Sequence, residues 1–544
     1  MLLIASLIGI YSYLIFILGL VGLLYKNLII WFISTNLLII IYINRKKIIG
    51  EIRNLKGSKK LLKENLLLLL SLIFFIQAVI NLIGAMGPEL AFDALWYHLT
   101  LPKLYLEQHT IFYIPGGLLY YSAMPKLGEM LYIVGLTFGN EILAKVIHFL
   151  FGILTSVALY KLQRKFFTPL ISIIGVLIFY SNLVVAWESA TAYVDLIRSF
   201  FEIMSLWAFI NWWEDGKRKW FILSAIMVGL AITTKLLAVG SLLIFSVIII
   251  IKQLKKWPLK PKLHNILYML LNTFTKVSVY LLIALTMPLP WFIFAFINTG
   301  NPVYPFFSQI YSIAPEPLII PGFFKEIWIL FTSSPDPLSP LYIIFLPIII
   351  FSFSKLRTEI KIISLYSVLA IVVWYFTPRT GGGRFILPYL PAFSIICAAC
   401  LNFLIENKKK YGELLPKFLI ILVIFVSLIS IGYRFAANSK YIPVLLGQET
   451  KQEFLTTHLN FAFGDFYDTD NFFKDNIKET DRVLLYGFHN LYYINFPFID
   501  SSWLKAWDTF NYIATQNTQL PEKYKNWKLV YTNNKTMVNL YKSP

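Results

Sequence analysis

The sequence predicts a polytopic α-helical membrane protein that ends in a small α/β domain. Hydrophobic residues make up 58% of the 544-residue chain, charged residues only 14%, and the mean hydropathy is +0.67. So few charges cannot solvate a globular surface, and many apolar runs approach the ~20 residues that a helix needs to cross a bilayer. Residues 435–544 have instead the mixed composition of a soluble domain. We therefore divide the chain into a transmembrane domain at 1–434 and an α/β domain at 435–544.

The positive charge of the chain indicates its topology. The formal net charge is +19 at pH 7, and the lysines and arginines gather in short clusters between apolar runs, the strongest at residues 45–63. Cytoplasmic loops of membrane proteins carry such clusters. We therefore attribute the positive charge to membrane topology. The lipid bilayer is an expected partner, and nucleic acid is not.

The apolar runs between these clusters give about thirteen predicted spans. They cover residues 3–24, 27–44, 65–86, 141–160, 168–187, 196–213, 220–234, 236–251, 269–297, 341–354, 359–377, 384–405 and 415–434. Only one span fits between Gly87 and the basic cluster at Lys161, so Lys126–Gly139 is predicted to be interfacial or re-entrant. This topology puts every basic cluster on one side. The N-terminus is then cytoplasmic, whereas the loop Gly87–Pro125 and the C-terminal domain lie outside.

Alternating patterns in the C-terminal domain predict short buried strands. They are RVLLYG at Arg482–Gly487 and WKLVYTN at Trp527–Asn533, and we expect helical stretches such as Ser501–Ala514 between them. Gly487 is followed by Phe-His-Asn and not by a GxGxxG pattern, so no nucleotide site is predicted. We expect this domain to cover a site or to hold an acceptor.

Several charged residues on the predicted outer face stand apart from the basic clusters. Ionisable groups within or against membrane spans are costly and tend to mark function. The set is Glu89, Asp93, Glu188, Asp195, Lys235, Arg379 and Arg384. These residues come from separate stretches but share one membrane face, so we expect them to converge on one outward cavity. Trp96, Tyr97 and His98 follow Asp93 directly and are candidates for substrate contact.

Each candidate also has a purely structural interpretation. Asp93 alone could be a solvated loop carboxylate, and Lys235 could extend to the interface from a span end. Asp195 and Arg198 are three residues apart on one predicted helix and could pair with one another. Trp96 and Tyr97 could belong to an aromatic belt at the membrane surface. His98 has no second histidine at metal-ligand spacing, which favours local packing.

Several segments resemble GT-C class membrane glycosyltransferases. FDALWYHLTLPKLYL and MPKLGEMLYIVGL are similar to the first outer loop of the bacterial family-39-like group, which is related to protein O-mannosyltransferases and lipid A aminoarabinose transferases. AYVDLIRSFFEIMSLWAF, GLAITTKLLAVG, GNPVYPFF and GGGRFILPYLPAF follow in the same order as similar patterns of that group. The resemblance implies that Asp93 is the catalytic base. Several relatives carry an acidic doublet there, whereas position 94 here is Ala, so a second carboxylate must come from Glu89, Glu188 or Asp195.

The implied activity is transfer of a hexosyl or pentosyl group from a polyprenyl phosphate-linked donor to an extracytoplasmic glycan, lipid or protein. Such a reaction needs a base and cations near the leaving phosphate. Asp93 is the expected base, Lys235, Arg384 and Arg379 the expected phosphate contacts, and a single displacement inverts the anomeric centre. Abundant Ile, Lys and Asn suggests a bacterial source, hence undecaprenyl phosphate as carrier and the inner membrane as location.

Three questions remain open from the sequence. A divalent cation, Mg or Mn, is an option because some GT-C enzymes use one and others do not. An O-antigen ligase or polymerase shares many spans and lipid-linked substrates but does not need an early acidic loop. A transporter or flippase is the other alternative, although the spans show no evident inverted repeat.

Overall fold

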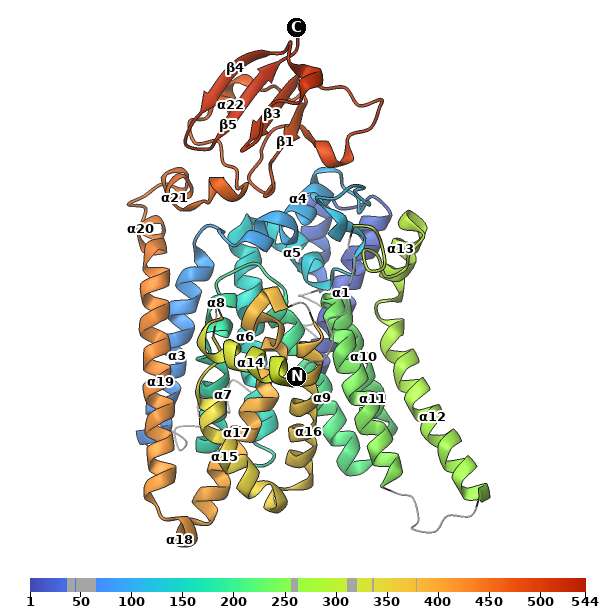
Figure 1. Ribbon diagram of the computed structural model, residues 1–544, viewed down its shortest axis with the longest axis vertical. Helices are drawn as coiled ribbons and strands as arrows, with labels where there is room; N and C mark the ends of the chain where they lie inside the picture. Colours follow the sequence, from blue (N-terminus) through green and yellow to red (C-terminus); the bar gives the residue numbers. More distant parts are fainter. Residues whose placement is uncertain (37–44, 46–64, 256–262, 311–319, 335–336, 378) are drawn as a thin grey trace.

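Long apolar helices form the body of the molecule in the computed structural model, which describes residues 1–36, 45, 65–255, 263–310, 320–334, 337–377 and 379–544 (Figure 1). Within these residues, eight helices are long and apolar enough to cross a membrane. They are Leu2–Leu20, Asn65–Met86, Glu141–Gln163, Leu236–Leu254, Asn265–Thr286, Thr358–Tyr375, Leu387–Glu406 and Leu414–Leu445. Shorter apolar helices occupy Leu127–Phe138, Pro169–Tyr180, Leu289–Thr299 and Leu341–Lys355. The class of a polytopic helical membrane protein is confirmed, whereas the count of about thirteen spans is not.

The helices of the body follow one another in the predicted order. The longer ones are α1 (Leu2–Leu20), α3 (Asn65–Met86), α6 (Glu141–Gln163), α9 (Asp195–Asp215), α10 (Arg218–Thr234), α11 (Val239–Leu254), α12 (Leu263–Thr286), α16 (Thr358–Tyr375), α17 (Leu390–Glu406) and α19 (Leu414–Asn438). The shorter ones are α4 (Thr100–Glu107), α5 (Leu127–Phe138), α7 (Pro169–Tyr180), α8 (Leu183–Glu188), α13 (Leu289–Thr299), α14 (Ile320–Thr332), α15 (Leu341–Ser352) and α18 (Lys408–Tyr411). Among these described helices, α4, α14 and α18 have no counterpart among the predicted elements.

Two predicted spans are each interrupted, which corrects the sequence interpretation. The span 168–187 is α7 followed by α8, because the Asn182 side chain donates to the Ile178 and Phe179 carbonyls at 2.6 and 3.1 Å and ends the first helix. The span 269–297 is α12 followed by α13, because Pro288 has no N–H to continue the helix. Residues 27–36 of the predicted span 27–44 are helical, and the rest of that span lies outside the described residues, as does most of the basic cluster at 45–63.

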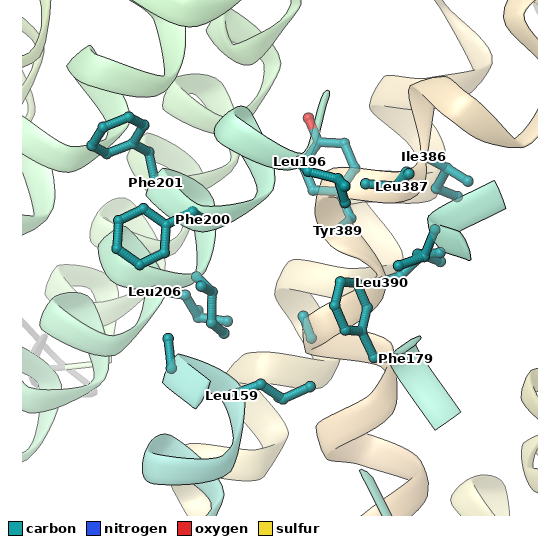
Figure 2. Close-up of a cluster of buried hydrophobic side chains, with 14 of the residues drawn as sticks. Leu159, Phe179, Leu196, Phe200, Phe201, Leu206, Ile386, Leu387, Tyr389 and Leu390 are labelled. Carbon is teal, nitrogen blue, oxygen red and sulfur yellow. The ribbon is translucent and has the colours of Figure 1, made fainter. Parts of the chain in front are cut away.

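The core of the body lies where α6, α7, α9 and α17 meet. Figure 2 shows Leu159, Phe179, Leu196, Phe200 and Leu390 from these helices converging, and each is at most 1% exposed. Almost every side chain of α9 is buried, which is the pattern of a central helix and not of an amphipathic surface helix. The outer helices α12 and α19 expose apolar side chains instead, as helices that face lipid do.

The C-terminal region after α19 contains a five-stranded mixed sheet. The strands are β1 (Val483–Tyr486), β2 (Phe498–Asp500), β3 (Tyr512–Gln516), β4 (Lys528–Asn533) and β5 (Val538–Lys542), in the order β2-β1-β3-β5-β4. β1 is parallel to β2 and β3, and β5 is antiparallel to β3 and β4. Short helices precede the sheet: α20 (Ile442–Leu445), α21 (Lys451–His458) and α22 (Phe472–Asn476). This small sheet domain confirms the fold class that the composition predicts.

Both predicted strands of this domain are present as β1 and β4, but the predicted helix at Ser501–Ala514 is wrong. Ser501–Trp503 form a single 3₁₀ turn, and β3 begins at Tyr512. Ile513 and Ala514 are fully buried in the middle of the sheet, so strand pairing on both sides determines the local structure there.

The sheet domain lies against one end of the helical body. In Figure 1 it lies above α4 and α5, whereas α18 lies at the opposite end. The loop Gly87–Pro125, which contains α4, therefore lies between the membrane helices and the C-terminal domain. This arrangement brings residues from both regions to the same face.

Candidate active site

The site begins at a local irregularity directly after Asp93. Residues Ala94–His98 form a π-helix, labelled η2, and α4 follows it. Such π-helical turns are rare and occur mostly at functional sites. The wide turn brings Trp96, Tyr97 and His98 to the wall of one cavity.

This cavity has a volume of about 420 Å³, which is within the usual range for ligand sites. Its walls come from the loop Gly87–Pro125, from α5, from the turn after α10, and from the segments around Pro305 and Arg384. The side chains that line it include Asp93, Trp96, Tyr97, His98, Tyr121, Lys126, Glu129, Lys235 and Arg384. Residues far apart in the sequence therefore meet here, as expected for the outer-face charges.

Arg384 is the centre of the ionic network at the site. Its Nη1 lies 2.6 Å from Asp93 Oδ2, and its Nε lies 2.9 Å from Asp195 Oδ2 and 3.4 Å from Glu188 Oε1. Lys235 Nζ lies 2.6 Å from the other oxygen of Asp195. Two cations thus pair with three carboxylates, of which Asp93 is 21% exposed and the other two are fully buried. Pairing of this kind is what makes such buried charge tolerable.

The backbone ahead of Arg384 has a sharp change of direction. Gly382 lies within the 3₁₀ segment η6 (Arg379–Phe385) and has a φ of 52°, a conformation that glycine adopts without a steric penalty. The guanidinium of Arg384 then packs 4.1 Å from the centre of the Tyr193 ring. The kink and the ring together fix the side chain that binds the carboxylates.

Asp93 has neighbours that determine its protonation. The Tyr97 hydroxyl donates to Asp93 Oδ2 at 3.4 Å, and the Asp93 amide donates to the Tyr193 hydroxyl at 3.2 Å. Burial raises the pKa of Asp93, but the positive charges of Arg384 and Lys235 oppose that effect, and the pKa lies below its ordinary value. Asp93 is therefore a carboxylate, able to accept a proton, at neutral pH.

A neutral histidine fixes the corner that carries Glu188 and Asp195. The Leu196 amide donates to His148 Nε2 at 3.0 Å, so the ring proton is on Nδ1, where the carbonyls of Glu188 and Thr191 accept it at 2.9 Å. This contact joins α6 to the turn between α8 and α9. The position of Asp195 thus depends on a buried hydrogen-bond network.

The predicted candidates divide into two groups. Asp93, Lys235, Arg384, Trp96, Tyr97 and His98 line the cavity, while Glu188 and Asp195 lie behind Arg384. Glu89 does not line the cavity, because its carboxylate accepts backbone amides; these contacts favour a structural role. The side chain of Arg379 lies outside the described part of the chain.

Two structural interpretations from the sequence are wrong. Arg198 does not pair with Asp195: its Nε lies 3.3 Å from Glu202, and its guanidinium donates to the Tyr389 hydroxyl at 2.8 Å. Lys235 does not extend into the interface, since its side chain is 16% exposed and paired with Asp195. His98 does pack locally, with Nδ1 2.8 Å from Glu129.

Three comparisons place the chain among known proteins. Residues 130–294 match the sequence model of the dolichyl-phosphate-mannose-protein mannosyltransferase family. The crystal structure of ArnT from Cupriavidus metallidurans in the apo state has a TM-score of 0.56 at 12% identity, covering 87% of this chain and 97% of ArnT. The chain shares the fold of this ArnT. The structure of the same ArnT bound to undecaprenyl phosphate gives 0.53 at 13% identity with the same coverage. No curated protein sequence matches the chain significantly.

The sequence did not identify two residues that line the cavity. Lys126 and Glu129 lie at the start of α5, which the sequence predicts only as an interfacial segment. Lys126 Nζ donates to the Met124 carbonyl at 2.7 Å, and burial lowers the pKa of Lys126 to about 7. A lysine and a glutamate at the start of an otherwise apolar helix on the outer face are the signal that could have identified them.

A divalent cation does not fit the carboxylates as they are arranged. Within the described residues, no group of three His, Cys, Asp or Glu side chains converges on a common point. Asp93 and Asp195 turn their oxygens to Arg384 and Lys235 instead. Asp93 and Asp195 are therefore engaged with these two cations, for which an anion can compete.

A second cavity, of about 770 Å³, lies between the loop and the C-terminal domain. The loop contributes Phe112 and Tyr113, and the domain contributes Phe498, Trp503 and other side chains of both charges. The loop Gly87–Pro125 thus contributes side chains to two ligand-sized spaces.

Proposed function

We propose that the protein is an integral membrane glycosyltransferase of the inner membrane that transfers a sugar from a polyprenyl phosphate-linked donor to an acceptor on the outer side. The observation that carries the proposal is one cavity in which the carboxylate of Asp93 faces the cations of Lys235 and Arg384. The family match at 130–294 and the fold shared with ArnT support it.

The cations of the cavity suit the donor phosphate. Lys235 and Arg384 both line the cavity, and a phosphate oxygen carries the negative charge that these two groups bind. Charge develops on the bridging oxygen as the sugar leaves, so preorganised cations there stabilise the transition state more than the ground state. The binding of undecaprenyl phosphate by ArnT supports a lipid phosphate as the natural anion.

The ion pair between Arg384 and Asp93 couples donor binding to the base. Without an anion, the 2.6 Å contact to Arg384 makes Asp93 a weak proton acceptor. A donor phosphate competes for the same guanidinium and weakens that contact. Asp93 then regains basicity at the moment when a donor is present, which limits unproductive reaction without substrate.

The reaction is a single displacement. An acceptor hydroxyl or amine gives its proton to Asp93 and forms a bond to the anomeric carbon, and the bond from that carbon to the phosphate oxygen breaks. The lipid phosphate leaves with the bonding pair. One displacement inverts the anomeric configuration, and the base contributes a rate factor of about 10²–10⁴.

A transfer assay tests this function. Membranes with the wild-type protein are incubated with undecaprenyl phosphates that carry labelled hexoses or pentoses, and label in non-donor products is measured. We expect transfer from one donor, and we expect the double variant Lys235→Gln/Arg384→Gln to lose both transfer and competition by free undecaprenyl phosphate. Transfer that survives the double variant would exclude this cavity as the donor site.

A further inference from the structure

The Tyr493 hydroxyl lies between the loop Gly87–Pro125 and α6. The hydroxyl accepts from the Glu89 amide at 3.1 Å, and it lies 2.9 Å from the Glu89 carbonyl and 3.2 Å from Glu141 Oε1, between which its single proton is shared. Tyr493 is 6% exposed, and Glu89 and Glu141 are each 1% exposed. A buried side chain of the C-terminal domain thus hydrogen-bonds both the amide and the carbonyl of Glu89.

Glu89 in turn joins the two segments that carry the site carboxylates. Its Oε1 accepts from the amides of Leu90 and Ala91 at 2.8 and 2.9 Å, and these residues are three and two positions before Asp93. Its Oε2 accepts from the Ala192 amide at 2.6 Å, three residues before Asp195. Both side-chain oxygens of Glu89 therefore act as acceptors. A carboxylate has two acceptor oxygens, whereas a carboxamide has only one.

The loop between β1 and β2 carries Tyr493 and is held by a lysine of α4. Lys103 of α4 donates to the carbonyl of Tyr492 at 2.9 Å and to the carbonyl of Ile494, on either side of Tyr493. Lys451 of α21 pairs with Glu141 at 2.5 Å. The docking of the C-terminal domain therefore determines where the Tyr493 hydroxyl lies.

We propose that Tyr493 is a positioning residue for the transfer reaction: through Glu89 it sets the separation of the Asp93 and Asp195 segments, so the site is complete only with the C-terminal domain docked. The inference rests on the proposed function for its effect on catalysis. The proposed effect of Tyr493 on the positions of the two segments does not depend on any enzymatic activity. The domain thereby belongs to the active site, although it touches no reacting atom.

Tyr493→Phe tests the inference, and Tyr492→Phe is the matched control. The Tyr492 hydroxyl donates to Glu141 Oε2 at 3.3 Å but makes no hydrogen bond to Glu89. Loss of the Tyr493 hydroxyl leaves a buried amide without its acceptor, so we expect kcat to fall on the order of tenfold with KM for the donor unchanged. Tyr492→Phe is expected to keep wild-type kcat.

Hydrogen exchange of the full-length protein in lipid nanodiscs separates positioning from activity. We expect Tyr493→Phe to increase exchange in peptides 86–95 and 188–197 together, and Tyr492→Phe to leave both unchanged. Unchanged exchange in Tyr493→Phe, or an equal increase in both variants, overturns the inference even where transfer is measured. A wild-type protein without transfer activity contradicts the proposed function, while the exchange result still decides the positioning.

A second variant keeps the test valid if Tyr493→Phe does not fold. Lys103→Met releases the carbonyls of Tyr492 and Ile494 and does not touch Glu89. We expect it to increase exchange at 86–95 by a smaller amount than Tyr493→Phe. No change there would contradict a path from the docked domain to the loop.

Discussion

Arg384 determines the charge state of the proposed base, which makes its effect measurable as a pH dependence. Its guanidinium contributes most of the positive potential that lowers the pKa of Asp93 against the effect of burial. A carboxyl with a depressed pKa stays ionised down to a lower pH, so the acid limb of kcat/KM for the wild type lies below the ordinary range of Asp.

Arg384→Gln is expected to move that acid limb to higher pH. Without the guanidinium, the effect of burial dominates and raises the pKa of Asp93. The rate also falls, because the contact to the donor phosphate is lost. Lys235→Met is the comparison, because Lys235 contributes less to the pKa of Asp93 and is expected to move the limb less. A limb that stays in place in Arg384→Gln would show that the ion pair does not control the base.

At the scale of helices, the packing around α9 depends on a buried polar cluster. Glu202 accepts from Arg198 on the same helix at 3.3 Å and from Tyr366 of α16 at 3.0 Å, and Ser241 of α11 also donates to it. Arg198 and Glu202 are each 1% exposed. Removal of one charge leaves the other buried without its partner.

Glu202→Ala is therefore expected to lower the free energy of unfolding by about 3–5 kcal/mol. The double variant Arg198→Met/Glu202→Leu removes both charges and is expected to lose much less. Thermal unfolding in detergent, with the same detergent and lipid for all variants, measures the difference. Equal losses in the single and double variants would show that packing volume, and not the unpaired charge, limits stability.

At the scale of the whole molecule, the larger cavity predicts a role for the C-terminal domain in acceptor binding. Trp503 lines that cavity, whereas Trp507 on the same domain is 78% exposed and does not line it. An aromatic ring in a ligand-sized space contributes contact area at little entropic cost.

Trp503→Ala is expected to raise KM for the acceptor several-fold and to leave competition by undecaprenyl phosphate unchanged. The control variant Trp507→Ala is expected to have the acceptor KM of the wild type. Steady-state kinetics at saturating donor measure this. An unchanged acceptor KM in Trp503→Ala would place acceptor binding elsewhere.

Local patterns predicted the class of the protein and much of its site. Apolar runs identified the helical body, and the alternating strand patterns at β1 and β4 identified part of the sheet. The charges of Asp93, Lys235 and Arg384 on one face predicted their convergence, because isolated charges against a membrane need partners.

The remaining features depend on tertiary contacts that no local pattern carries. The break at Asn182 depends on its own side chain capping carbonyls, and β3 depends on strands on both sides of it. The sequence could not predict that Arg198 chooses Glu202 over Asp195, since both spacings suit a helix. The role of Tyr493 depends on a contact with Glu89 across most of the chain.

The most direct test of the account is label transfer by Asp93→Asn in membranes. The variant must elute as a folded protein after solubilisation and must still bind undecaprenyl phosphate, because Lys235 and Arg384 are intact. The account predicts that transfer falls by about 10²–10⁴ relative to the wild type. Transfer within a few-fold of the wild type by a folded, donor-binding Asp93→Asn would contradict it.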